Sequence, residues 1–142
     1  MRISAEHTTF LINSFDEALS LAEKTPSGEE KLYYFSYVFG SINRIINIDF
    51  DPCLLFIHQE LQSVHTSIQG RLNRPVTPSN VNIASTPDEI FEALFRHVKR
   101  LREAIIENNE SNVYMILQDL SQVGYAATGN GFYLYQTGKL KL

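Results

Sequence analysis

The stretch from Thr86 to Asn109 constrains the fold of this 142-residue chain more than any other. It begins Thr-Pro-Asp-Glu, in which threonine can cap a helix, proline suits the first helical position, and Glu89 can reach back to the cap. Apolar side chains then recur every three or four residues and form one continuous face: Phe91, Leu94, Val98, Leu101 and Ile105. A helix with such a face needs other helices to cover it.

The rest of the chain supplies further helices of the same kind. Capping residues followed by apolar stripes predict helices that begin at Ser4, at Ser27 and at Asp51, and another that begins at about residue 110. The helix after Ser27 is the most apolar, and tyrosines widen its apolar band. A band this broad is typical either of the centre of a bundle or of a contact between subunits.

These patterns predict a mainly α protein, an up-and-down bundle of four to five helices in one domain over residues 1–142. The third helix is expected to end near Asn73, because Arg74 precedes a proline and such residues avoid helical geometry. The segment from about 74 to 86 contains two prolines and mostly small polar residues. We expect it to be a long, exposed crossover loop.

The last segment, residues 129–142, has a different pattern. Phe132–Tyr135 and Lys139–Leu142 flank Gln-Thr-Gly, and the alternation about a glycine turn is typical of a short β-hairpin. Gly129-Asn130-Gly131 is interpreted as the end of the preceding helix. An isolated hairpin is marginally stable in water, so we expect this one to pack on the bundle or to pair with another chain.

Composition and charge limit the location and the partners. The net charge of −4 speaks against nucleic acid and anionic membranes as partners. The longest apolar run is far too short to cross a membrane, and the residues after Met1 lack the pattern of an export signal. The single cysteine, Cys53, is interpreted as a small buried side chain. We therefore expect a cytoplasmic protein without a cofactor.

Histidines on the third helix form one candidate site. His58, Gln62 and His65 share a helical face at the edge of the apolar stripe. The two histidines lie roughly 10 Å apart along the helix axis, so a metal or small-molecule site would need further groups such as His97. The alternative is that these histidines are hydrogen-bonded or solvated at the edge of the core.

A block of basic residues on the organising helix, from Arg96 to Arg102, forms another candidate site. Arg96, Lys99 and Arg100 could contact nucleic-acid phosphates. The alternative is a self-complementary surface in which residues four apart, Glu92 with Arg96 and Lys99 with Glu103, form exposed ion pairs.

The remaining candidates are aromatic. Tyr133 and Tyr135 on the predicted hairpin, together with Tyr37, could anchor a protein partner. The motifs of zinc proteases, di-iron bundles and serine hydrolases are absent from the sequence. We therefore expect a non-catalytic interaction module, such as a small acidic adaptor, inhibitor or immunity-type protein, that forms a homodimer or binds a basic protein. A bundle that binds a metal or small molecule is the alternative, and nucleic-acid contact ranks third.

Overall fold

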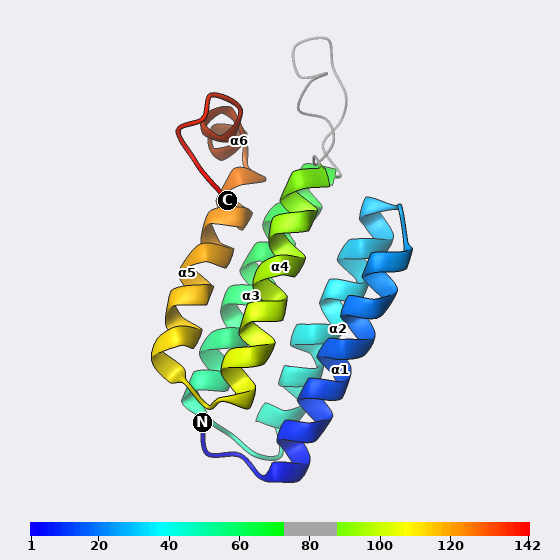
Figure 1. Ribbon diagram of the computed structural model, residues 1–142, viewed down its shortest axis with the longest axis vertical. Helices are drawn as coiled ribbons and strands as arrows, with labels where there is room; N and C mark the ends of the chain where they lie inside the picture. Colours follow the sequence, from blue (N-terminus) through cyan, green and yellow to red (C-terminus); the bar gives the residue numbers. More distant parts are fainter. Residues whose placement is uncertain (73–87) are drawn as a thin grey trace.

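The computed structural model describes residues 1–72 and 88–142, and the regular structure in these residues is entirely helical. The predicted mainly α class fits this structure. The crossover predicted for about residues 74–86, and the proposed cap Thr86, lie outside the described residues. The helices are α1 (Ala5–Lys24), α2 (Gly28–Ile46), α3 (Pro52–Leu72), α4 (Asp88–Ile106), α5 (Glu110–Ala126) and α6 (Gly129–Gln136) (Figure 1).

The five long helices pack side by side in a closed ring. Around the ring the order is α1, α2, α3, α5, α4, and α4 returns to contact α1. Successive long helices alternate in direction (Figure 1). Because the ring contains an odd number of helices, one neighbouring pair must be parallel, and this pair is α3 and α5.

The core lies inside this ring and contains the predicted apolar faces. The α4 stripe that organises the sequence is buried along its whole length, from Phe91 to Ile105. Phe15 of α1, Phe35 of α2 and Ile57 of α3 are also fully buried. Each helix therefore turns one apolar face inward, as the spacing of its residues predicts.

Helix caps confirm the predicted starts of α1, α2 and α3. The hydroxyl of Ser4 accepts a hydrogen bond from the His7 amide at 3.1 Å, and the Ser27 hydroxyl accepts one from the Glu30 amide at 3.3 Å. The Asp51 carboxylate accepts one from the Cys53 amide at 2.8 Å. These bonds satisfy amides that have no partner within the first helical turn.

The predicted C-terminal hairpin is wrong, because the segment forms α6. The hydroxyl of Thr128 caps this helix by accepting from the Gly131 amide at 3.3 Å. Phe132 is buried, Leu134 and Tyr135 are half-buried, and Tyr133 is exposed. Four consecutive apolar residues fit one helical turn as well as a strand, and here the helix covers the end of α5 (Figure 1).

The glycine interpreted as a hairpin turn instead ends α6. Gly138 has a φ of 76°, which favours glycine because it lacks a β-carbon. The Lys139 amide bonds to the Leu134 carbonyl at 2.9 Å, and the Gly138 amide bonds to the Tyr135 carbonyl at 3.2 Å. This pair of bonds is the Schellman arrangement that ends many helices.

Gly131 sets how closely α6 approaches α5. A β-carbon at this position would lie 1.7 Å from the carbonyl oxygen of Tyr125. We predict that Gly131→Ala displaces α6 and exposes Phe132, which lowers the free energy of unfolding by about 2 to 3 kcal/mol. Urea denaturation would measure this loss.

Gly70→Ala is the matched control, because Gly70 lies within α3 and its β-carbon would meet nothing within 4 Å. This control should be neutral or stabilising, since alanine favours helix. Equal stability of the two variants would contradict the close approach at Gly131.

Candidate functional site

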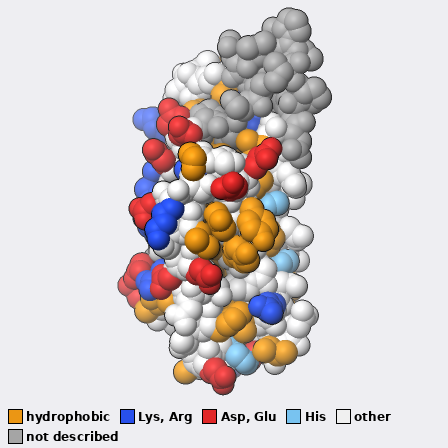
Figure 2. All heavy atoms as spheres, turned by 90° about the vertical axis from the view of Figure 1, so that its right-hand side faces the viewer, with side chains coloured by type: hydrophobic (Ala, Val, Ile, Leu, Met, Phe, Trp, Pro, Cys, Tyr) orange, Lys and Arg blue, Asp and Glu red, His pale blue; other side chains and the backbone are white. Residues whose placement is uncertain are grey.

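The outer face of α2 carries three tyrosines in mutual contact. The ring centroids of Tyr33 and Tyr37 are 5.2 Å apart, and that of Tyr34 lies 5.7 Å from Tyr33 and 6.1 Å from Tyr37. Tyr33 is 58% exposed and Tyr37 is 46% exposed. We call these three residues the tyrosine ridge. Figure 2 shows hydrophobic side chains gathered on the face of the molecule formed by α1 and α2.

The spacing of residues along α2 explains why the ridge faces outward. Phe35, Val38 and Ile42 occupy the buried side of the helix, so the tyrosines at positions 33 and 37 lie on the other side, one turn apart. Their hydroxyl groups contact each other at 3.1 Å. This hydrogen bond is the main cause of the raised pKa of the Tyr37 hydroxyl.

Two grooves run beside the ridge. The α1/α2 groove has a volume of about 390 Å³ and is lined by Phe10, Tyr37, Gly40 and Arg44, among others. The α2/α3 groove has a volume of about 510 Å³, and its lining includes Tyr33. The ridge is therefore a raised aromatic strip with a depression on each side.

The predicted aromatic anchors are not brought together. Tyr37 belongs to the ridge, whereas Tyr133 and Tyr135 lie on α6. Tyr133 is 62% exposed, but Tyr135 packs against the core and its ring centroid lies 6.3 Å from that of Phe132. Burial raises the pKa of the Tyr135 hydroxyl, with smaller contributions from two α4 carboxylates.

The sequence prediction omitted Tyr33 as an anchor. Its separation of four residues from Tyr37 on the exposed side of a strongly apolar helix is the signal that identifies it.

The candidate histidines do not converge. His58 and His65 are half-buried beside Phe39, with ring centroids 6.0 Å and 5.3 Å from its ring. His97 is buried on α4, where its Nδ1 lies 2.8 Å from Nη1 of Arg100. Gln62 is exposed. In the described part of the chain, none of these histidines belongs to a group of three close potential ligands.

The one such group found among the described residues is Asp51, Cys53 and Glu110. Its carboxylates already have partners: Asp51 accepts from the Arg2 amide at 3.0 Å, and Glu110 contacts the Met1 amino group at 2.7 Å. Burial is the main cause of the raised pKa of the Cys53 thiol, which disfavours the thiolate that binds metal. These contacts hold turns together and give no support for a metal site.

The basic block divides into two parts. Arg100 pairs with Asp119 of α5 at 2.7 Å, and Arg102 pairs with Asp16 of α1 at 2.5 Å. Among the described residues, Arg96 and Lys99 form no ion pair, so the two pairs expected from four-residue spacing are not formed. Arg100 contacts both Asp119 and His97, which leaves it poorly placed to bind nucleic-acid phosphate.

Acid should destabilise the bundle through its histidines. Burial lowers the pKa values of His58, His65 and His97 below the ordinary 6.5, and the Arg100 charge adds to this effect at His97. The unfolded chain therefore binds more protons as the pH falls through 6.5 toward the folded-state values, and stability decreases over that range.

Urea denaturation at pH 7.5 and pH 5.0 would measure this loss. A variant with all three histidines replaced by glutamine should show a smaller pH dependence, whatever its absolute stability. An unchanged dependence would contradict the assignment to these histidines.

In the described part of the chain, no helix has the length and apolarity needed to cross a membrane. Searches against protein-family models, curated proteins and solved structures gave no match.

Proposed function

We propose that this chain is a non-catalytic protein-interaction module that associates with a second copy of itself through the tyrosine ridge. The main support for this proposal is the exposure of Tyr33 and Tyr37 on α2, between two grooves. Tyrosine contributes a large contact area at low entropic cost and is enriched at the centres of interfaces. The single buried cysteine fits a reducing compartment, and we propose a cytoplasmic location.

The order of charges along α2 supports a second copy as the partner. Glu29 lies in the first turn of the helix and Arg44 in the last turn, with the tyrosine ridge between them. Both are exposed, and neither forms an ion pair within the described residues. When two copies of α2 pack in opposite directions about a twofold axis, Glu29 of each copy can face Arg44 of the other.

The shape of the surface fits the same pairing. Because the two helices run in opposite directions, a register that places Glu29 opposite Arg44 also places Tyr33 opposite Gly40. No atom lies within 4 Å of the position where a β-carbon of Gly40 would stand, and this glycine lines the α1/α2 groove. Tyr33 of one copy would therefore occupy the groove beside Gly40 of the other.

Removal of the exposed rings should weaken self-association. We predict that Tyr33→Ser combined with Tyr37→Ser raises the dimer dissociation constant by roughly tenfold or more, because central tyrosines carry much of the energy of an interface. Sedimentation velocity over a concentration series would measure this change, and circular dichroism should show unchanged helicity.

Tyr125→Ser combined with Tyr133→Ser is the matched control, since these tyrosines are also exposed but lie on α5 and α6. The control should dimerise like the original protein. If the original protein is monomeric at every concentration, or if both variants are equally weakened, the proposed interface is wrong.

Charge exchange would test the register. Glu29→Arg alone and Arg44→Glu alone should each weaken the dimer, because each places like charges opposite one another across the twofold axis. The double variant exchanges the two charges and should restore association, which native mass spectrometry can measure. A double variant as weak as the single ones would exclude this pairing of the helices.

A further inference from the structure

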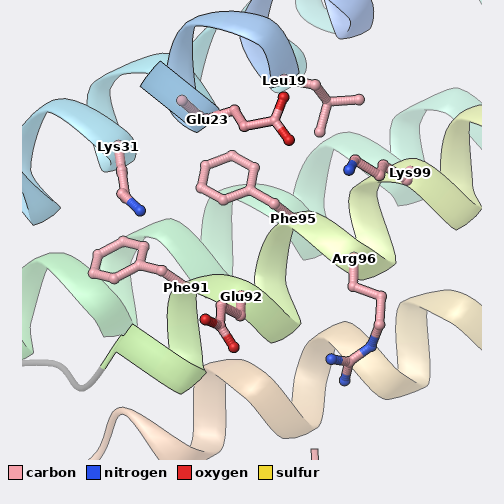
Figure 3. A pocket seen from close by; sticks show the side chains of 9 residues that line it. Leu19, Glu23, Lys31, Phe91, Glu92, Phe95, Arg96 and Lys99 are labelled. Carbon is pink, nitrogen blue, oxygen red and sulfur yellow. The ribbon is translucent and has the colours of Figure 1, made fainter. Parts of the chain in front are cut away.

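A pocket between α1 and α4 lies away from the tyrosine ridge. It has a volume of about 410 Å³, within the range typical of sites for small molecules. Its apolar lining consists of Leu19 and Ala22 of α1 with Phe91 and Phe95 of α4. Figure 3 shows the two phenylalanine rings side by side on the face of α4 that looks toward α1 and the start of α2.

Charged side chains surround these rings. Lys31 of α2 lies near Phe91, Lys99 of α4 lies toward the other end of the pocket, and Glu23 of α1 lies beside Phe95 (Figure 3). Arg96 and Glu92 also line the pocket, but Arg96 points away from the rings in this view. The lining therefore carries three cations and two anions.

The lysines of this pocket are available to a ligand. Among the described residues, neither Lys31 nor Lys99 forms an ion pair, although Glu23 lines the same pocket. Lys99 belongs to the basic block of α4, whereas Lys31 lies on α2. Arg100 and Arg102 of the same block do form ion pairs, with Asp119 and Asp16. Ion pairs thus neutralise Arg100 and Arg102, whereas Lys99 lies beside the apolar lining of the pocket without an ion pair to any described residue.

A second depression continues the pocket along α1 and α4. It shares Leu19, Glu23 and Lys99 with the pocket, so the two form one groove. The Arg102–Asp16 pair lines the second depression and joins α4 to α1 there. An extended ligand can lie along the rings with its charged end at a lysine.

We propose that this groove binds a small amphipathic organic anion, with its apolar body against the half-buried side chains of Leu19 and Phe95 and its carboxylate at Lys31 or Lys99. The lining as a whole has one more cation than anions, and this favours an anion over a cation. The apolar lining favours an organic body over inorganic phosphate or a nucleic-acid backbone. Self-association through the tyrosine ridge is not required for this binding.

Decanoate, kept below its micelle concentration, is the probe, and isothermal titration calorimetry would measure its affinity. We predict saturable binding that is weaker in both Lys31→Gln and Lys99→Gln. The loss should be roughly fourfold for the lysine that holds the carboxylate, the size expected for one charge a few ångströms away in a water-exposed site, and smaller for the other. Glu23→Gln should bind decanoate more tightly by a similar factor, because it removes a repelling carboxylate. Decylamine, which has the opposite charge, should bind more weakly than decanoate.

Lys139→Gln combined with Lys141→Gln is the matched control, since both lysines are exposed and lie outside the groove. This variant should bind decanoate like the original protein, as should the Tyr33→Ser and Tyr37→Ser double variant. The proposal is overturned if decanoate does not bind at millimolar concentration, if decylamine binds equally well, or if the Lys139 and Lys141 variant loses as much affinity as Lys31→Gln.

Discussion

The burial of one apolar face on each of five helices is the constraint on which the rest of the structure depends. The α4 stripe is covered from both sides, by α1 and by α5, and α2 also reaches it across the ring. Since no single neighbour covers a face this wide, the ring must close. Closure with an odd number of helices requires a parallel pair, which is α3 and α5. The outer faces of α2 and α4 remain on the surface and carry the tyrosine ridge and the basic block, respectively.

The ends of the helices are joined by polar contacts made by the segment before α1. The Ser4 amide and the ring of His7 both contact Asp49, at 2.9 Å and 2.7 Å, and the Arg2 amide contacts Asp51 at 3.0 Å. The bond from Ser4 is the main cause of the lowered pKa of Asp49, and the contact with His7 adds to it. These contacts tie the start of the chain to the turn between α2 and α3, and Glu110 ties it to the start of α5.

Patterns within single segments of the sequence predicted the helices and several of their caps. Contacts between helices could not be predicted from such patterns. Ser27 and Asp51 could be identified as caps because a cap and its partner are within three residues of each other. The partner of Arg102, by contrast, is Asp16 of α1, which no spacing within α4 can reveal.

The segment Phe132–Tyr135 is too short to distinguish a strand from a helical turn, and the close packing of Gly131 on α5 favours the helix. Tyr37 could be named as a candidate anchor from the sequence, but its aromatic neighbours on the exposed surface could be chosen only once the buried side of α2 was known.

The buried polar groups of the described residues are engaged in the fold. Four polar side chains are buried in the described part of the chain. Ser41 bonds to the Val38 carbonyl, Asp51 to backbone amides, and His97 contacts Arg100. The guanidinium carbon of Arg71 lies 3.9 Å from the ring centroid of Phe132. The exposed tyrosines and the lysines of the α1/α4 groove are different, because the stability of the bundle does not require their exposure. The two proposed binding surfaces therefore rest on groups that the fold leaves exposed rather than on groups that hold it together.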